Sequence, residues 1–309
     1  MKQILLVSLI LLLIVFILPI IAGIPQAYVA PVEEPPPSPE EKASPEPEII
    51  VTATPSPSAT PATSTSVSVS VTIGGSPTSL PLSEYLYGVL LGEMPEGFPE
   101  EALKAQAVAA RTYTLYALAH PTTDGVHPDT ALCDNPAHCQ AYNKPPYSGK
   151  IIRAVDDTDG VLVVYEGEPI MAVYFSASWG RTESALDVWG ADVPYLQSVE
   201  SPGEEDAPRY ISEVAAEGVS VTNIERTAAG GVREAAVDGV TMSGASIRAR
   251  FGLNSTNFEL VETSNGVIFR TIGYGHGVGL SQYGARAMAL EGKNYREILE
   301  HYYSGASVV

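Results

Sequence analysis

The sequence predicts a mixed α+β domain over residues 66–309, and three observations support this fold class. Apolar residues recur at helical spacing on both sides of Pro95. Residues 67–73 alternate apolar and polar side chains with period two, which is typical of a strand. Residues 282–290 and 295–302 have the pattern of two helices that close the domain.

The first two predicted helices have recognisable boundaries. Ser83 is a candidate N-cap for a helix over residues 84–92, and Pro95 stops that helix. A second helix starts at Pro99, because proline suits the first helical turn and the two glutamates that follow suit the helix N-terminus. We expect this helix to end near His120.

The remainder of the domain is predicted in less detail. Residues 122–150 are rich in proline, aspartate and asparagine and form a long loop, which inside a compact domain is usually functional. Strands are predicted at residues 160–165, 169–175 and 267–272. Residues 210–250 mix helical and strand patterns, so they support no assignment of elements.

The N-terminus predicts a membrane anchor. An apolar run from Ile4 to Ile24 is long enough to span a bilayer as a helix. Lys2 precedes the run and no Lys or Arg follows before Lys42, which places the N-terminus in the cytoplasm and the rest of the chain outside. A cleaved signal peptide is the alternative, but the length of the run favours an uncleaved, single-pass anchor over residues 1–25.

The composition indicates a stalk and argues against one class of partner. Residues 26–65 are dominated by Pro, Glu, Ser, Thr and Ala, which predicts a disordered, extended stalk between the anchor and the domain. The net charge is −19, and the chain has no block rich in Lys or Arg. Nucleic-acid binding needs such a basic surface, so we expect none.

Two blocks far apart in the chain carry most of the functional information. One runs from Glu84 through Glu-Met-Pro to Tyr113, and the other is GYGHGVGLSQYG, from Gly273 to Gly284. Together they resemble the stage II sporulation protein D family, and the resemblance covers roughly residues 78–305. It implies a two-lobed extracytoplasmic domain that cleaves the glycan strands of peptidoglycan.

Glu93 is the candidate catalytic residue. Cleavage of a glycosidic bond requires a proton donor, and a carboxyl group serves well when an apolar setting raises its pKa. Leu90, Leu91 and Met94 flank Glu93 and could provide that setting. By itself, a glutamate at a helix end is usually a solvated surface residue. The resemblance reverses this expectation, because the matching glutamate of the family is its catalytic acid and base.

The chain has no obvious partner carboxylate for Glu93. Hydrolysing glycosidases normally use two carboxylates, and neither block contains a second one that demands such a role. A lytic transglycosylase needs only one, because the C6 hydroxyl of muramic acid is the nucleophile and forms a 1,6-anhydro ring. The resemblance implies this activity on peptide-stripped glycan during spore engulfment, beside a peptidoglycan amidase that removes the stem peptides and a membrane partner.

The resemblance also covers candidate substrate-binding residues. Arg111 could bind the lactyl carboxylate that peptide removal exposes, because a guanidinium pairs with carboxylates in a bidentate manner; otherwise it is an ordinary helix residue. His276, Gln282 and Tyr283 belong to the glycine-rich block, which lines the catalytic cleft in the family. Taken alone, the alternating glycines indicate only a bulged turn.

The long loop contains a candidate zinc site. His127, Cys133, His138 and Cys139 offer the nitrogen and sulfur ligands that Zn²⁺ prefers, but a disulfide within the loop is an equal alternative from the residues alone. Some clostridial members of the family look similar here, with a His-x5-Cys-x5-Cys zinc site beside the cleft. His127, Cys133 and Cys139 fit that spacing, so the resemblance favours zinc, in a structural or a catalytic role.

Two rival functions accompany the transglycosylase. One is a non-enzymatic wall-binding enhancer of a peptidoglycan amidase, since a related branch of the family includes such enhancers. The other is a zinc hydrolase, in which the ligands His127, Cys133 and Cys139 leave an open coordination position. The Glu-Met-Pro motif at Glu93 favours the transglycosylase.

Overall fold

The computed structural model describes residues 67–121 and 130–309. The predicted anchor (residues 1–25), the predicted stalk (residues 26–65) and His127 lie outside these residues. Within the described part of the chain, no helix is both long enough and apolar enough to cross a membrane.

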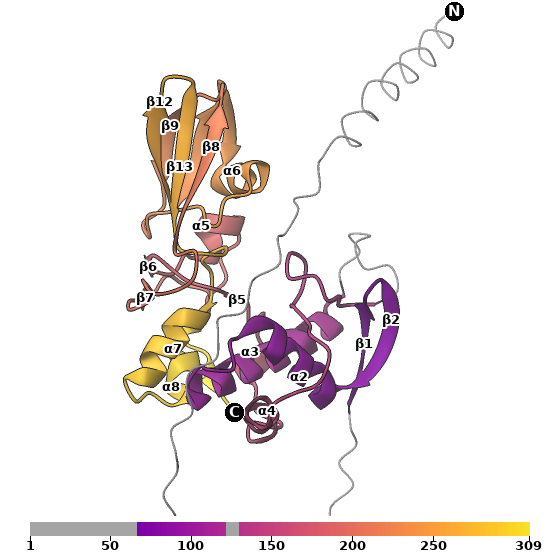
Figure 1. Cartoon of the computed structure of the whole chain (residues 1–309). Coiled ribbons are helices and arrows are strands. Elements are labelled where there is room, and N and C mark those ends of the chain that lie inside the picture. The colour runs from indigo at the N-terminus through magenta and orange to yellow at the C-terminus, as the bar shows by residue number, and fades with distance from the viewer. Residues whose placement is uncertain (1–66, 122–129) are drawn as a thin grey trace, which may run out of the picture. The chain divides into compact units, whose positions relative to one another are not determined.

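The described residues confirm a mixed α+β fold of helices and several small sheets (Figure 1). The helices are α2 (Leu82–Glu93), α3 (Glu100–Ala119), α4 (Gly149–Asp156), α5 (Ala185–Trp189), α6 (Gly244–Phe251), α7 (Gln282–Leu290) and α8 (Tyr295–Tyr302). The strands are β1 (Ser68–Ile73), β2 (Ser76–Pro81), β3 (Val163–Tyr165), β4 (Glu168–Pro169), β5 (Tyr174–Phe175), β6 (Gly180–Arg181), β7 (Glu200–Ser201), β8 (Ile211–Glu217), β9 (Val221–Arg226), β10 (Val232–Val237), β11 (Val240–Ser243), β12 (Phe258–Thr263), β13 (Gly266–Ile272), β14 (Leu280–Ser281) and β15 (Ser307–Val308).

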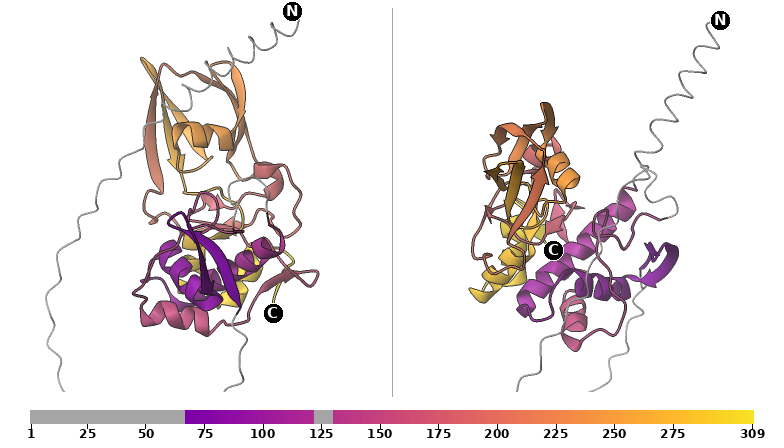
Figure 2. Two further views of the ribbon diagram at one scale, coloured as in Figure 1. Left: turned by 90° about the vertical axis from the view of Figure 1, so that its right-hand side faces the viewer. Right: turned by 45° about the horizontal axis from the view of Figure 1, so that its top comes forward.

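Helix α3 is the central element of the helical part. It packs against α2, α4, α7 and α8, which the views in Figures 1 and 2 place around it. Small side chains on α3 allow this close approach from several sides. Its fully buried alanines are Ala102, Ala105, Ala107, Ala109 and Ala110. The helix starts after Pro99 and ends at its C-cap, His120, as the sequence predicts.

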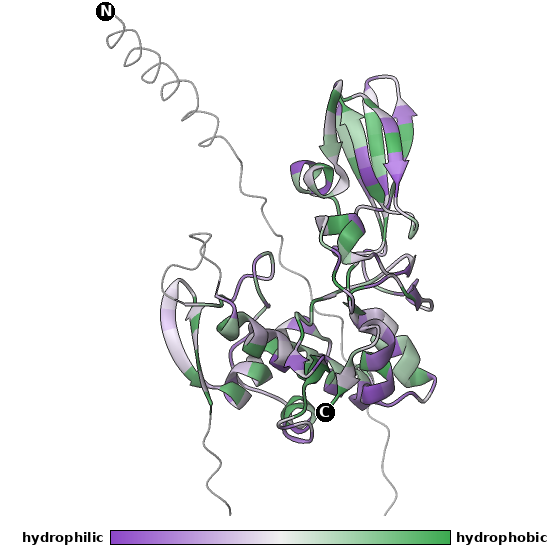
Figure 3. Ribbon diagram, turned by 180° about the vertical axis from the view of Figure 1, so that it is seen from behind, coloured by the Kyte–Doolittle hydropathy of each residue, from purple (hydrophilic) through white to green (hydrophobic). Residues whose placement is uncertain are grey.

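Two three-stranded antiparallel sheets include β8 to β11, which occupy the region that the sequence left unassigned, and β13, which confirms the strand predicted at residues 267–272. Their strand orders are β12-β13-β8 and β11-β10-β9, and α6 packs on β10 and β11. Hydrophobic and hydrophilic residues alternate along several of these strands (Figure 3), so one face of each sheet can be buried. A second apolar cluster, distinct from the core around α3, forms here and includes Val237, Ile247, Phe258 and Phe269.

Several predicted boundaries differ from the structure. Helix α2 begins at Leu82 after Pro81, which is its N-cap, so the assignment of the N-cap to Ser83 was wrong. The strands expected at residues 160–165 and 169–175 are much shorter, because the chain changes partners within them. Strands β3 and β4 pair with each other, whereas β5 pairs with β14.

The glycine-rich block lies directly against the segment that contains β5. Strands β5 and β14 run parallel, with Tyr174 opposite Leu280. Gly279 has a φ of +79°, and a Cβ atom there would lie 2.2 Å from the carbonyl oxygen of Val173. Only glycine permits this approach of two backbones. The contact brings the start of α7, which carries Gln282, next to Tyr174.

Candidate active site

Glu93 lies at the end of α2 in a pocket of about 570 Å³. The carboxylate is half-buried, and the backbone of Met94 leaves the helix in an extended conformation. The pocket draws its lining from α2, α3, α6, α7, β5, the loop before α4 and the glycine-rich block. Its lining includes Cys139, Gln140, Tyr174, Arg248, His276 and Gln282.

Three donors hold the Glu93 carboxylate. The backbone N–H of Ala141 donates to Oε1 at 2.6 Å, and Nε2 of Gln282 donates to Oε2 at 3.1 Å. The hydroxyl of Tyr174 lies 3.4 Å from Oε1 and is a weaker third donor. The carboxyl group is therefore fixed in one orientation by parts of the chain that are distant in sequence.

The contact with Ala141 depends on a glycine in α2. A Cβ atom at Gly92 would lie 2.9 Å from the carbonyl carbon of Ala141, so any larger residue would push this loop off the helix. The missing side chain lets the Ala141 N–H reach the carboxylate at the helix end. Gly92, which directly precedes Glu93, is therefore needed for the structure around the carboxylate.

The surroundings of Glu93 favour its protonated form. Burial raises the pKa of the Glu93 carboxyl above its usual range, because the charged form loses hydration. The hydrogen bonds from Ala141, Gln282 and Tyr174 stabilise the carboxylate and offset part of this rise in pKa. A carboxyl group with a raised pKa can both donate and accept a proton near neutral pH.

A buried glutamine extends the network behind Glu93. Gln140 is fully buried, and its Oε1 accepts a hydrogen bond from the Tyr174 hydroxyl at 2.9 Å. Its Nε2 donates to the hydroxyls of Tyr85 at 3.1 Å and Thr114 at 3.0 Å. Sequence reasoning selected neither Gln140, which directly follows Cys139 in the chain, nor Tyr174.

His276 lines the pocket but its ring is tied to the backbone. Its Nε2 lies 3.0 Å from the carbonyl oxygen of Tyr174, and its Nδ1 accepts from the N–H of Val278 at 3.1 Å. This pattern requires the neutral tautomer with hydrogen on Nε2. Burial, with a contribution from the charge of Arg248, lowers the pKa of His276 to about 4. His276 is therefore a neutral residue that holds the glycine-rich block against β5.

Tyr283 is not brought into this pocket. Its ring packs edge-on against Phe98 with the centroids 5.0 Å apart, and it is absent from the pocket lining. The expectation that Tyr283 contacts substrate came from its place in the glycine-rich block, and it stays a prediction. Successive residues at the start of a helix point in different directions, so only Gln282 faces Glu93.

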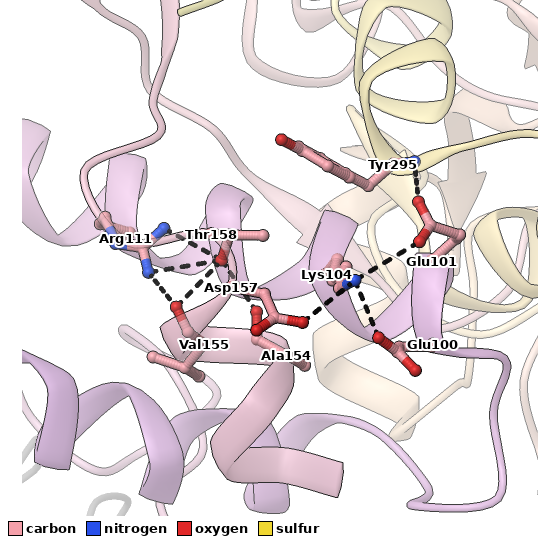
Figure 4. Close-up of polar contacts among 9 residues, drawn as sticks. All are labelled: Glu100, Glu101, Lys104, Arg111, Ala154, Val155, Asp157, Thr158 and Tyr295. Atoms are coloured by element: carbon pink, nitrogen blue, oxygen red, sulfur yellow. Dashed lines mark hydrogen bonds and ion pairs between the residues drawn. The ribbon is translucent and has the colours of Figure 1, made fainter. Parts of the chain in front are cut away.

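Arg111 also lies outside the lining of the Glu93 pocket, and its role in binding a substrate carboxylate stays a prediction. It is 2% exposed, and its Nη2 donates to the carbonyl oxygen of Val155 at 2.9 Å (Figure 4). Its Nη1 donates to the carbonyl oxygen of Val161 at 3.2 Å, and Thr158 accepts weaker contacts. These bonds tie α3 to the end of α4 and use both Nη groups, whereas the buried Nε has no hydrogen-bond partner among the described residues.

Arg248 is a pocket residue that sequence reasoning missed. It comes from α6, in the region of the chain that supported no assignment, so nothing in its local pattern drew attention to it. Among the described residues that line the pocket, it is the one arginine or lysine. Its Nε donates to the carbonyl oxygens of Leu253 and Asn254, each at 3.2 Å.

The family model described as Stage II sporulation protein matches residues 76–165. The chain is 36% identical to the stage II sporulation protein D of Bacillus subtilis (strain 168), an alignment that covers 77% of each chain. The chain belongs to the stage II sporulation protein D family. It is also 34% identical to the protein of that name from Bacillus amyloliquefaciens, over 77% of this chain and 76% of the relative.

This member of the stage II sporulation protein D family also resembles a protein that is named for a different role. The amidase enhancer of Bacillus subtilis (strain 168) is 26% identical over 72% of this chain and 40% of its own length. The family assignment made from the two sequence blocks is therefore confirmed, whereas the narrower assignment to a zinc-containing clostridial type stays a prediction.

Some of the candidate zinc ligands lie at the pocket of this family member. Cys139 and His138 line the pocket, and Cys133 is buried where its segment pairs with Thr72 of β1. The Tyr113 hydroxyl hydrogen-bonds Cys139, and both cysteines lie near Tyr113. Within the described residues, no three His, Cys, Asp or Glu side chains form a metal-binding group, and His127 lies outside them.

Proposed function

We propose that the domain is a peptidoglycan lytic transglycosylase in which Glu93 is the general acid and then the general base. One observation carries the proposal: Glu93 is the only carboxylate among the described residues that line its pocket, and burial raises its pKa. A glycan strand bound in the pocket would meet one proton donor and no partner carboxylate. This is the requirement of a reaction in which the substrate supplies its own nucleophile.

The reaction balances with Glu93 alone. The protonated carboxyl donates its proton to the glycosidic oxygen as the bond from that oxygen to C1 of muramic acid breaks. The resulting carboxylate accepts the proton of the C6 hydroxyl, whose oxygen bonds to C1 and closes the 1,6-anhydro ring. Glu93 ends protonated, as it began, and no water is consumed.

The other buried carboxylates are engaged away from the pocket. Glu204 accepts hydrogen bonds from three serines, and Oε1 of Glu183 accepts from the Thr227 hydroxyl at 2.8 Å and the Gly231 N–H at 3.0 Å. Neither residue lines the pocket of Glu93. A hydrolase of the two-carboxylate type would need such a partner several ångströms from Glu93.

The residues around Glu93 would support both proton transfers. Ala141 and Gln282 keep each carboxylate oxygen in place, so the proton is delivered from a fixed direction. They also stabilise the carboxylate that forms after the first transfer. Tyr174, which Gln140 and the glycine-rich block hold, adds a hydroxyl on the same side.

The cellular setting is part of the proposal. The names of the Bacillus relatives support a role in sporulation, and the apolar run at residues 4–24 supports a single-pass anchor with the domain outside the cytoplasm. Peptide-stripped glycan as substrate implies an amidase that acts first, as expected for the engulfment machinery.

We also propose that Zn²⁺ binds His127, Cys133 and Cys139. The donor chemistry fits, because two thiols and an imidazole are common zinc ligands and both cysteines lie near Tyr113 in one neighbourhood. When bound, zinc would supply a cross-link of the loop before α4. This loop contributes Ala141 and Gln140 to the site, so a fixed loop would keep both residues beside Glu93.

Product analysis tests the transglycosylase. The protein and its Glu93→Gln variant are incubated with peptide-stripped peptidoglycan, and mass spectrometry follows the appearance of 1,6-anhydro ends. Loss of the general acid should lower the rate by about 100- to 10,000-fold. Glu96→Gln, which changes an exposed glutamate nearby, is the matched control and should keep the full rate. Anhydro ends formed by Glu93→Gln at the unmodified rate would refute the role of Glu93, and reducing ends would indicate a hydrolase.

The amidase enhancer relative supports a second candidate, a non-enzymatic enhancer of an amidase. The same variants separate the two functions. An enhancer should accelerate amidase action equally with Glu93 or Gln at this position, and it should release no anhydro ends. A transglycosylase should release them in the absence of any amidase, once the peptides have been removed.

A further inference from the structure

Arg248 is a cation in the pocket of Glu93, and part of its guanidinium is available to bind a ligand. It lines the same pocket as Glu93 but comes from α6. Ser243 caps the start of α6, where its side chain accepts the N–H of Ser246, and Gly252 ends the helix in the left-handed conformation. Arg248 is therefore held on a short, well-capped helix.

The guanidinium of Arg248 is anchored on one edge only. Its Nε donates to the carbonyl oxygens of Leu253 and Asn254, which follow α6. Within the described residues, its two Nη groups have no hydrogen-bond partner, and the side chain forms no ion pair. The neighbouring Arg250, by contrast, pairs with Asp238 at 3.3 Å.

The Arg248 guanidinium is partly buried, yet no carboxylate among the described residues pairs with its positive charge. Burial lowers the pKa of Arg248 because the charged form loses hydration, yet arginine stays protonated in proteins. His276 cannot share the charge, because it is neutral near pH 7. The pocket thus presents a permanent positive charge whose two free Nη groups match the geometry of a carboxylate.

We propose that Arg248 binds the free lactyl carboxylate of muramic acid and so selects glycan strands that have lost their stem peptides. The proposal rests on the proposed function, because it assigns to Arg248 the recognition of the sugar that Glu93 cleaves. A lactyl group joined to a peptide is a neutral amide and cannot form the bidentate ion pair. Selection then follows from the charge of the substrate at this one position.

Binding measurements test the proposal without turnover. The Glu93→Gln protein is titrated with peptide-stripped glycan oligomers, and with the same oligomers after their lactyl carboxylates are converted to methylamides. Loss of a charge-assisted pair should weaken binding by about 10- to 150-fold. Adding Arg248→Gln should remove this preference, and Arg248→Lys should restore part of it. Arg250→Gln, an exposed arginine on the same helix, should keep the preference.

The outcomes separate this proposal from the proposed function. Equal binding of the two oligomers by the Glu93→Gln protein overturns the proposal, even if Arg248→Gln fails to fold. A preference that survives in Arg248→Gln overturns it as well. If the unmodified protein releases no anhydro ends but the preference persists and depends on Arg248, the carboxylate site stands and the transglycosylase assignment fails.

Discussion

The side-chain amide of Gln282 donates to Oε2 of Glu93 at 3.1 Å, although 189 positions separate the two residues. One residue ends α2 and the other begins α7, and each belongs to a separate block of the sequence. The bond joins the two blocks directly. It also lowers the pKa of Glu93 relative to what burial alone would produce.

Removing this amide should change the pH dependence of glycan cleavage. Gln282→Ala removes a donor that stabilises the Glu93 carboxylate, so the pKa of Glu93 should rise further. Activity requires the protonated acid in the first step, so kcat/KM falls as pH rises through that pKa. The alkaline limb of the pH–rate profile should therefore move to higher pH, with a lower maximum rate.

Tyr283→Phe provides the control for this profile. Tyr283 is adjacent to Gln282 but lies outside the pocket lining, so its hydroxyl should not affect the pKa of Glu93. An alkaline limb that stays in place in Gln282→Ala would show that the amide does not tune Glu93 in solution.

Arg111→Ala should act on stability. The substitution removes the donor to the part-buried carbonyl of Val161, and it leaves the Val155 carbonyl with only the Thr158 hydroxyl, which donates at 3.1 Å. An unsatisfied carbonyl costs about 1–3 kcal/mol. Chemical denaturation should show this loss in the free energy of unfolding. Arg181→Ala, which breaks an exposed pair with Glu200, should cost less than about 1 kcal/mol.

Arg111→Ala should also leave substrate selection unchanged. Any loss of cleavage rate should be the same for peptide-stripped glycan and for its amidated form. A selective loss for the form with free carboxylates would return Arg111 to the substrate-binding role that the sequence suggested.

Glu204 should position Gln282 indirectly, through Ser281 at the start of α7. Its carboxylate accepts from the Ser281 hydroxyl at 2.6 Å, and Ser281 is the N-cap of α7. Glu204→Gln places an amide N–H₂ among hydroxyl donors and loses charge-assisted bonds worth about 1.5–3 kcal/mol each. We expect a lower melting temperature and a lower kcat.

A purely structural role for Glu204 would lower the melting temperature and leave the chemistry of the folded protein intact. The measurement that distinguishes the two roles is the pH–rate profile well below the melting temperature. If Glu204 positions Gln282, the profile of Glu204→Gln should shift in the same direction as that of Gln282→Ala. An unshifted profile would contradict the positioning role.

Metal analysis of the purified protein tests the zinc proposal. We expect about one zinc per chain, and chelation should make both Cys133 and Cys139 reactive toward a thiol reagent. Cys133→Ser should lower the zinc content and loosen the loop that carries Ala141, so Glu93-dependent cleavage should fall with it. A protein without metal whose mass is lower by two hydrogens would instead contain a disulfide.

Much of the helical part could be predicted from local patterns. The prolines around α2 and α3 limit where each helix can run, and Glu93 follows from the Glu-Met-Pro motif. The strands were harder, because β3, β4 and β5 each have only two or three residues and pair with different partners. Strand length depends on the partner, which a single-sequence pattern does not show.

The sequence by itself determined the family and the two blocks that help to build the pocket. Only the tertiary structure decided which neighbours face Glu93: Gln282 does and Tyr283 does not, and Arg248 replaces Arg111 as the cation of the pocket. The physical reason is that a side chain's role depends on the direction in which packing points it and on the groups already bonded to it. Arg111 uses its Nη groups on backbone carbonyls, whereas Arg248 keeps its Nη groups available in the pocket that Glu93 also lines.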